Sequence, residues 1–341
     1  MTPRQNLIAA LNGETPEHTP LSIYDWFLQN EPVEEVRRLT DQGLLLVRGV
    51  ANYRYVEHGV QNESREWMQN GRRHWVFARH TPVGTIQMAG EETWVTEHFL
   101  KTPADYKVMQ WIIEHTEIVP DYNAFPQAEE ALGERGLVCT GLSRTPAMCI
   151  NVDWAGTENF CLHLAEEWNE LFDLYHARKK LFMEEVRAEA GGPGRFVRLI
   201  ENLTISMLGP KWYGELLMSV YEEAFPMLRA AGKRVFVHYD GALRVIADQI
   251  ARAPFDGIES LTEPPEGDMT YDECRAAWPD KVFWAHINVS CYALPPEQLT
   301  EAVLAKQQRA GKRGLAFEIS EDLPANWRAS IPVVLRALER T

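Results

Sequence analysis

Short apolar segments alternate with longer stretches of helical periodicity along most of the chain. Apolar runs of this length are typical of buried strands, and apolar positions recurring every three or four residues are typical of amphipathic helices. Regular alternation of the two predicts parallel βα units. The predicted strands are 18–25, 43–49, 136–141, 195–202, 234–240, 255–260, 281–287 and 313–319. Helices are predicted before the first strand and at 165–190, 211–232, 242–253, 270–278, 295–311 and 323–340.

The number of βα units predicts an α/β protein of the (β/α)8 TIM-barrel class. Eight such units fit within 341 residues, so we interpret residues 1–341 as one barrel domain. An open, doubly wound sheet remains the alternative at this point, because strand order cannot be read from the sequence.

Residues 51–95 interrupt the alternation. They are rich in aromatic and β-branched residues and contain the turn signal Asn70-Gly71. This pattern predicts an inserted β-hairpin region near the N-terminus, with one or two hairpins forming a lid over one face of the barrel. The alternative is an edge hairpin that plays no part in the site.

Composition and charge narrow the class of protein. The chain is 45% apolar and 24% charged, as in ordinary globular proteins. Its formal net charge of −15 argues against a nucleic-acid partner, because the phosphate backbone requires a basic face. There is no 18-residue apolar run and no signal-peptide pattern, so we expect a cytoplasmic protein with no membrane partner. The five cysteines include no C-x-x-C pair and are expected to be reduced thiols.

Polar side chains stand at the ends of the predicted strands. The carboxyl ends of barrel strands open into the active site, so polar residues there are candidates for chemistry. His238 and Asp240 are two residues apart, which places both side chains on one face of a strand. Other strand-end residues are Tyr24, Asp25, Glu201, Tyr239, Glu259, His286 and Glu318.

Four of these residues could together hold a metal ion. His238 and Asp240 from one strand, joined by Glu259 and Glu318 from later strands, would give zinc a set of nitrogen and oxygen ligands. Each residue also has a structural interpretation. A strand-end histidine can simply be hydrogen bonded, Asp240 can cap the next helix, and Glu259 can cap a segment or pair with an arginine.

Several segments resemble the uroporphyrinogen decarboxylase superfamily, which includes zinc-dependent, corrinoid-linked methyltransferases. The resemblance covers most of the chain and implies a TIM barrel. The segments that carry it are RQNLIAALNGETPEHTPLSIYD (4–25), AGTENFCLHL (155–164), VFVHYDGAL (235–243), FDGIESLTEPP (255–265), KVFWAHINVS (281–290) and EISEDLPANW (318–327).

Within that superfamily the chain is more similar to the methyltransferases than to the decarboxylases. The decarboxylases carry arginines after the first strand, where this chain reads IYDWFLQNEP. The methyltransferases hold zinc with a His-x-Cys and a later Cys. Here His238 matches the histidine, whereas Asp240 and Glu318 stand at or near the cysteine positions and Glu259 matches a glutamate of more distant relatives. Oxygen ligands suit a Lewis acid acting on an oxygen atom rather than on a thiol.

The resemblance implies a methyltransferase of the O-demethylase type. It would demethylate a small methylated or methoxylated compound, with the many aromatic residues favouring an aromatic one. The methyl group would pass to the cob(I)alamin of a separate corrinoid protein, since the chain lacks the D-x-H-x-x-G pattern of corrinoid-binding domains. We interpret Glu201, His286 and Tyr239 as candidate catalytic residues and Tyr24, Asp25 and Trp26 as candidate substrate-binding residues.

Three other functions remain open on the sequence alone. One is a decarboxylase of the uroporphyrinogen type. Another is a two-carboxylate barrel hydrolase using Glu201 with Glu259 or Glu318. The third is a non-catalytic barrel that binds a ligand or partner. The sequence is also compatible with a homodimer.

Overall fold

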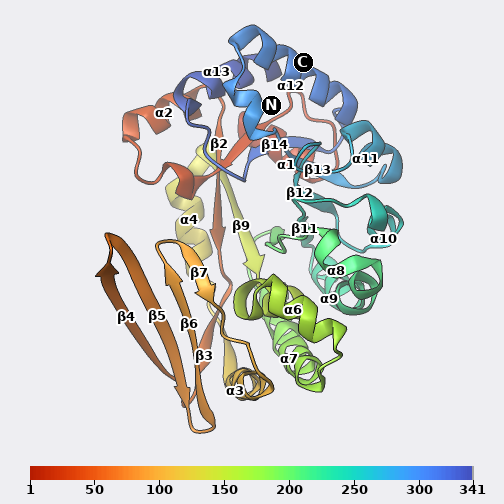
Figure 1. Cartoon of the computed structure of the whole chain (residues 1–341). Coiled ribbons are helices and arrows are strands. Elements are labelled where there is room, and N and C mark those ends of the chain that lie inside the picture. Colours follow the sequence, from red (N-terminus) through yellow and green to blue (C-terminus); the bar gives the residue numbers. More distant parts are fainter. Residues whose placement is uncertain (340–341) are drawn as a thin grey trace.

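Eight parallel strands close into a barrel in the computed structural model, which describes residues 1–339 (Figure 1). Residues 340–341, at the end of the predicted helix 323–340 and of the predicted domain 1–341, lie outside the described residues. The strand order around the barrel is β1-β14-β13-β12-β11-β10-β9-β2, which confirms the TIM barrel and excludes the open sheet. The strands are β1 (Leu21–Tyr24), β2 (Leu45–Val50), β9 (Gly136–Leu142), β10 (Phe196–Leu199), β11 (Arg234–His238), β12 (Gly257–Leu261), β13 (Val282–His286) and β14 (Leu315–Ile319).

Helices surround the barrel and follow its strands in the order expected for βα units. The predicted helix 211–232 is interrupted, because a π-helical turn, Tyr213–Met218, separates two α-helices there. The α-helices are α1 (Pro3–Leu11), α2 (Val33–Asp41), α3 (Pro103–Glu114), α4 (Ala124–Leu132), α5 (Pro146–Met148), α6 (Thr157–Ala165), α7 (Asn169–Gly191), α8 (Ile205–Trp212), α9 (Ser219–Ala230), α10 (Ala247–Arg252), α11 (Tyr271–Ala277), α12 (Pro296–Ala310) and α13 (Trp327–Leu338). Among the described residues, none of these helices combines the length and apolarity needed to cross a bilayer.

Alternation along the strands produces two apolar cores. Outward-facing residues pack against the surrounding helices, and inward-facing residues fill the barrel itself. Helix α1 closes the amino-terminal end of the barrel with Leu7, Ala10 and Leu11. The inward-facing apolar residues of the strands include Leu45, Val47, Leu137, Cys139, Phe196, Phe236, Val282, Trp284 and Ala316. The polar inward positions therefore form a separate layer nearer the carboxyl ends of the strands.

The segment after β2 forms antiparallel strands beside the barrel (Figure 1). Strand β3 (Tyr53–Glu57) pairs with β8 (Thr116–Pro120), and β4 to β7 make a four-stranded sheet. Asn70 and Gly71 connect β4 to β5 with positive φ angles of 51° and 79°, as a tight hairpin turn requires. The strands of this sheet are β4 (Gln61–Gln69), β5 (Arg72–Thr81), β6 (Gly84–Glu91) and β7 (Trp94–Glu97). Hairpins thus form where the sequence predicts them, while a lid function stays a prediction.

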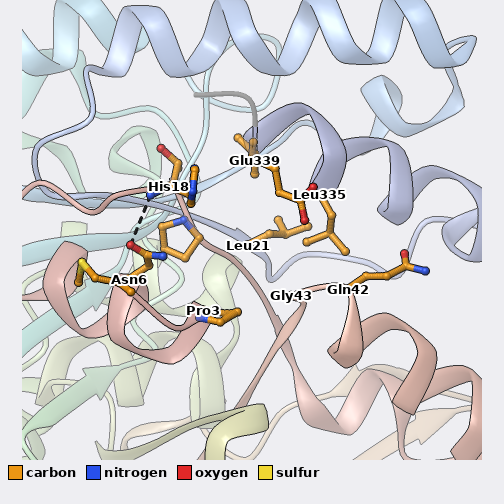
Figure 2. Close-up of a pocket in the computed structure, with 12 residues that line it drawn as sticks. Pro3, Asn6, His18, Leu21, Gln42, Gly43, Leu335 and Glu339 are labelled. Atoms are coloured by element: carbon orange, nitrogen blue, oxygen red, sulfur yellow. Dashed lines mark hydrogen bonds between the residues drawn. The ribbon is translucent and has the colours of Figure 1, made fainter.

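A pocket opens at the amino-terminal end of the barrel, away from the carboxyl ends of its strands (Figure 2). It lies at the amino-terminal ends of β1 and β2, between α1 and α13, and is lined by Leu21, Gly43 and Leu335 among others. The Asn6 side-chain oxygen accepts a hydrogen bond from the backbone N–H of His18 at 3.3 Å, which ties α1 to the chain before β1. Since catalysis in TIM barrels occurs at the carboxyl ends of the strands, we assign this pocket no role in the site.

Candidate metal centre

Above the apolar interior, the barrel contains a layer of polar and charged side chains. The strand register brings His238 beside Glu259, and it brings Glu318 between His286 and Ser22. Arg198 from β10 and Tyr24 from β1 join this layer, and Arg198 stacks over the Tyr24 ring at 4.8 Å. These side chains alternate along their strands with outward-facing apolar residues, so all of them point into the barrel.

The His238 imidazole lies at the centre of this layer and has carboxylates on both ring nitrogens. Nδ1 donates a hydrogen bond to Glu259 Oε2 at 2.9 Å. On the other side, Nε2 lies 3.4 Å from Asp240 Oδ2 and 3.6 Å from Glu321 Oε1. Burial opposes a charge on the ring, but the carboxylates of Glu259 and Asp240 raise the pKa of His238 to about 10. The negative charges of the Asp240 and Glu321 carboxylates next to Nε2 therefore favour a cation at this position.

His238, Asp240 and Glu321 have the geometry of a metal-binding group. One ligand atom from each lies within 4.8 Å of the other two. In a tetrahedral zinc site with bonds of 2.0–2.1 Å, neighbouring ligand atoms are about 3.3 Å apart. The separations of 3.4 and 3.6 Å from Nε2 are close to that value. This donor set of one imidazole and two carboxylates fits zinc.

Glu259 lies behind His238 rather than within this group. Its Oε1 accepts hydrogen bonds from the Tyr24 hydroxyl and from Arg198 Nη1, the latter at 2.9 Å. Burial opposes ionisation, but the charges of Arg198 and His238 hold the pKa of Glu259 below its usual value. Both carboxylate oxygens of Glu259 thus accept hydrogen bonds within the protein. Pairing with an arginine, considered from the sequence as the alternative to a ligand role for Glu259, is observed.

Glu318 lies deeper in the barrel and is also outside the group. Its Oε1 accepts a hydrogen bond from the Ser22 hydroxyl at 3.3 Å, and no hydrogen-bond donor among residues 1–339 reaches Oε2. Burial, together with the nearby Glu259 carboxylate, raises the pKa of Glu318 well above its usual value. Glu318 is not among the three residues whose ligand atoms lie together.

Two residues in strained backbone conformations support the carboxylates of the group. Asn202 donates to Asp240 Oδ2 at 3.4 Å, and the Ser260 hydroxyl donates to Glu321 Oε1. Asn202 and Ser260 have φ angles of 50° and 61°, in the left-handed region that residues other than glycine rarely adopt. Ser260 also lies at a bulge in β12, where the register shifts. Bulges and strained residues of this kind concentrate at functional sites.

Asp240 does not cap the segment that follows β11. Asp268 has that role, since its Oδ1 accepts hydrogen bonds from the backbone N–H groups of Leu243 and Arg244 at 2.7 and 3.1 Å. The Asp240 carboxylate remains directed toward His238 and Asn202. The capping interpretation of Asp240 therefore has no support in these contacts, and the ligand interpretation stays a prediction.

His286 faces the same layer with one free nitrogen. Its Nδ1 lies 3.1 Å from the carbonyl oxygen of Glu318 and 3.4 Å from the backbone nitrogen of Ser320, and the shorter contact, to an oxygen that can only accept, assigns the proton to Nδ1. Its Nε2 is buried and has no partner within the described residues. Burial lowers the pKa of His286 to about 4, so the ring is neutral and Nε2 is an acceptor.

Glu201 and Tyr239 are placed outside the polar layer. Glu201 accepts hydrogen bonds from the Thr145 backbone N–H and from the Tyr221 hydroxyl, at 3.1 and 2.8 Å. Burial raises the pKa of Glu201 to about 7. Tyr239 directly follows His238 and so points to the other side of the strand, where its hydroxyl lies 3.2 Å from that of Tyr213. The structure does not bring either residue to the metal group.

The three candidate substrate-binding residues lie at different depths. Tyr24 is buried in the polar layer, where its hydroxyl donates to Glu259. Asp25 forms an ion pair with Arg48 at 2.6 Å on the rim. Trp26 is 55% exposed and stacks on Phe27 with ring centroids 4.0 Å apart. Only Tyr24 is brought together with the histidine.

Reasoning from the sequence missed Arg198 and Glu321. Arg198 carries a detectable signal, because an arginine within the apolar strand segment RFVRL must have a buried partner. Glu321 follows the last strand in EISED, beside other acidic residues, and no local pattern distinguishes it from them.

Comparison with known proteins identifies the fold. No family model and no curated protein sequence matches the chain. Among solved structures, the chain is similar to a methyltransferase from Methanosarcina mazei, with 10% sequence identity and a TM-score of 0.58, covering 100% of this chain and 99% of that one. It also matches a B12-independent methionine synthase from Shewanella sp. W3-18-1, with 9% identity, a TM-score of 0.44 and coverage of 83% and 76%. The first likeness shows a shared TIM barrel along the whole chain.

Proposed function

We propose that this chain is a zinc-dependent methyltransferase that demethylates a small methoxylated compound. The observation that carries the proposal is the convergence of His238 Nε2, Asp240 and Glu321, at separations suited to zinc ligands. These three residues would hold the metal. They replace the set expected from the sequence, in which Glu259 and Glu318 were ligands. The architecture shared with the Methanosarcina methyltransferase supports the reaction class.

Glu259 orients the metal-binding histidine in this proposal. A histidine that binds zinc through one nitrogen commonly donates its other N–H to a carboxylate, which fixes the ring and increases its basicity. Glu259 receives the Nδ1–H of His238 and is itself held by Arg198 and Tyr24. Glu201 is a positioning residue, because it fixes the chain next to Asn202, the partner of Asp240.

The donor set suits chemistry at an oxygen atom. Bound zinc would supply a Lewis acid that stabilises the oxygen leaving the methyl group. In the transfer, the bond between the methyl carbon and the oxygen breaks, its electron pair stays on the oxygen, and the methyl group passes to a strong nucleophile. His286 Nε2 is free to accept a hydrogen bond from the substrate, because its Nδ1–H stays on the Glu318 carbonyl.

The nucleophile in this proposal is the cob(I)alamin of a separate corrinoid protein. The resemblance of the sequence to corrinoid-linked methyltransferases supports this partner, as does the missing D-x-H-x-x-G pattern. The balanced reaction converts the methyl ether and cob(I)alamin to methylcob(III)alamin and the free alkoxide or phenoxide, which takes a proton from water.

The test is an assay of methyl transfer to free cob(I)alamin, in which the absorption spectrum of the corrinoid is monitored over time. We expect the zinc-loaded chain to form methylcob(III)alamin from at least one compound in a panel of methoxybenzoates, methoxyphenols and methanol. His238→Ala should reduce the rate by at least about 100-fold, since it removes a proposed metal ligand. Release of carbon dioxide from the benzoates without methyl transfer would favour the decarboxylase alternative instead. Hydrolysis of aryl glycosides would favour the two-carboxylate hydrolase.

A further inference from the structure

A cavity of about 620 Å³ opens at the barrel mouth. It lies between the carboxyl ends of β2, β9 and β10 and the inserted strand β3. Gly49 and Gly141 occupy inward positions of β2 and β9 and line it. A volume of this size holds a small organic ligand. The two glycines leave space where larger side chains would fill the barrel.

Arg198 presents unused hydrogen-bond donors to this cavity. Its side chain lines the cavity, and the residue is only 9% exposed. Nη1 donates to Glu259, whereas Nη2 has no hydrogen-bond partner within the described residues. A Cβ atom at Gly49 would lie 3.2 Å from Nη2, which shows that Nη2 points toward the glycine-lined space. A buried guanidinium with free N–H groups is a preformed partner for an anion.

A second arginine stands at the same cavity. Arg54, on β3, lines it and forms no ion pair within the described residues. The whole chain carries a net charge of −15, so a wall of this cavity that carries two arginines differs in sign from the chain as a whole. Arg54 and Arg198 together give this part of an acidic protein a local attraction for negative charge.

The remaining walls are mainly aromatic and aliphatic, with the hydroxyl side chains of Thr140 and Ser143 among them. Tyr53 and Tyr55 meet edge to face, with ring centroids 5.7 Å apart. The Tyr53 hydroxyl donates to the buried Glu185 at 3.0 Å, which fixes the position of its ring. Val50, Leu142 and Ile200 add aliphatic surface to the lining. A ligand here would have a flat apolar body and a negative group.

From these observations we propose that the cavity binds an aromatic carboxylate, with its carboxylate on Arg198 and Arg54 and its ring against Tyr53 and Tyr55. None of the three residues of the proposed metal group lines this cavity, so the proposal concerns a binding site beside that group and does not depend on methyl transfer. Arg198 connects the cavity to the metal group, because Glu259 joins its guanidinium to His238 through contacts of 2.9 Å each.

The test measures binding of benzoate and of benzamide to the full chain by isothermal titration calorimetry. The two probes have similar shapes but differ in charge, and neither has a methyl group to transfer. We expect benzoate to bind at least about tenfold more tightly than benzamide. Arg54→Ala should weaken benzoate binding about tenfold, whereas the control Arg65→Ala, at an exposed arginine on β4, should leave it unchanged.

A cavity-filling variant provides a second measurement. A Cβ atom at Gly141 makes only an ordinary contact, 3.7 Å from the Arg198 carbonyl oxygen, so Gly141→Val is expected to fold and to block both probes. Equal affinities for benzoate and benzamide, no benzoate binding, or equal effects of the Arg54 and Arg65 variants would each overturn the proposal. Benzoate binding in a chain that fails to transfer methyl groups would leave the cavity site standing and reject the proposed function.

Discussion

Glu259→Gln is expected to destabilise the folded chain by about 3 kcal/mol, because it leaves the buried Arg198 guanidinium without its carboxylate. The same substitution should weaken zinc binding about 10–100-fold, since a neutral amide holds the His238 ring less firmly than a carboxylate. Urea unfolding gives the first quantity, and competition with a zinc-binding dye gives the second.

Glu318→Gln is the matched control, because it changes a second buried carboxyl group of the same layer. Burial and the nearby Glu259 carboxylate raise the pKa of Glu318 well above its usual value, so a neutral amide of similar shape replaces a group whose ionised form is disfavoured. We expect a change in stability below about 1 kcal/mol and no change in zinc affinity. If the two variants behaved alike, the charge assignment of this polar layer would be wrong.

Glu321→Gln should lower zinc affinity by at least about 100-fold, since losing a direct ligand costs more than losing a residue that orients one. The neighbouring Asp322→Asn removes the same charge from the same loop and should have no such effect. Comparison of the two variants by zinc titration separates coordination from the general acidity of the loop.

The Glu321 measurement also distinguishes the two possible ligand sets. If Glu321→Gln retained full zinc affinity and Glu318→Gln lost it, the set expected from the sequence would be correct. The set defined by the structural geometry would then be rejected.

The fold could be predicted because its signals are local. Each barrel strand is an apolar run bounded by helical periodicity, and all eight predicted strands overlap observed ones. Asn70-Gly71 likewise specifies a hairpin turn through its own backbone preferences. The pairing of β3 with β8 joins segments separated by the whole four-stranded sheet, and no local pattern encodes it.

The candidate site was predictable only where strand geometry decides it. His238 and Asp240 were correctly expected to approach each other, because their spacing fixes a common face. The same alternation shows that Tyr239 faces away from His238. Glu318 points inward as expected but lies too deep, and Glu321 reaches His238 from a loop whose path depends on tertiary packing. Depth within a barrel and the paths of loops are not encoded by periodicity.

The zinc content of the purified chain tests the central claim most directly. We predict about one zinc ion per chain, with retention in His58→Ala, where an exposed histidine is removed, and loss in His238→Ala. A native chain that binds no zinc when zinc is supplied, or a His238→Ala variant that keeps it, would contradict the account.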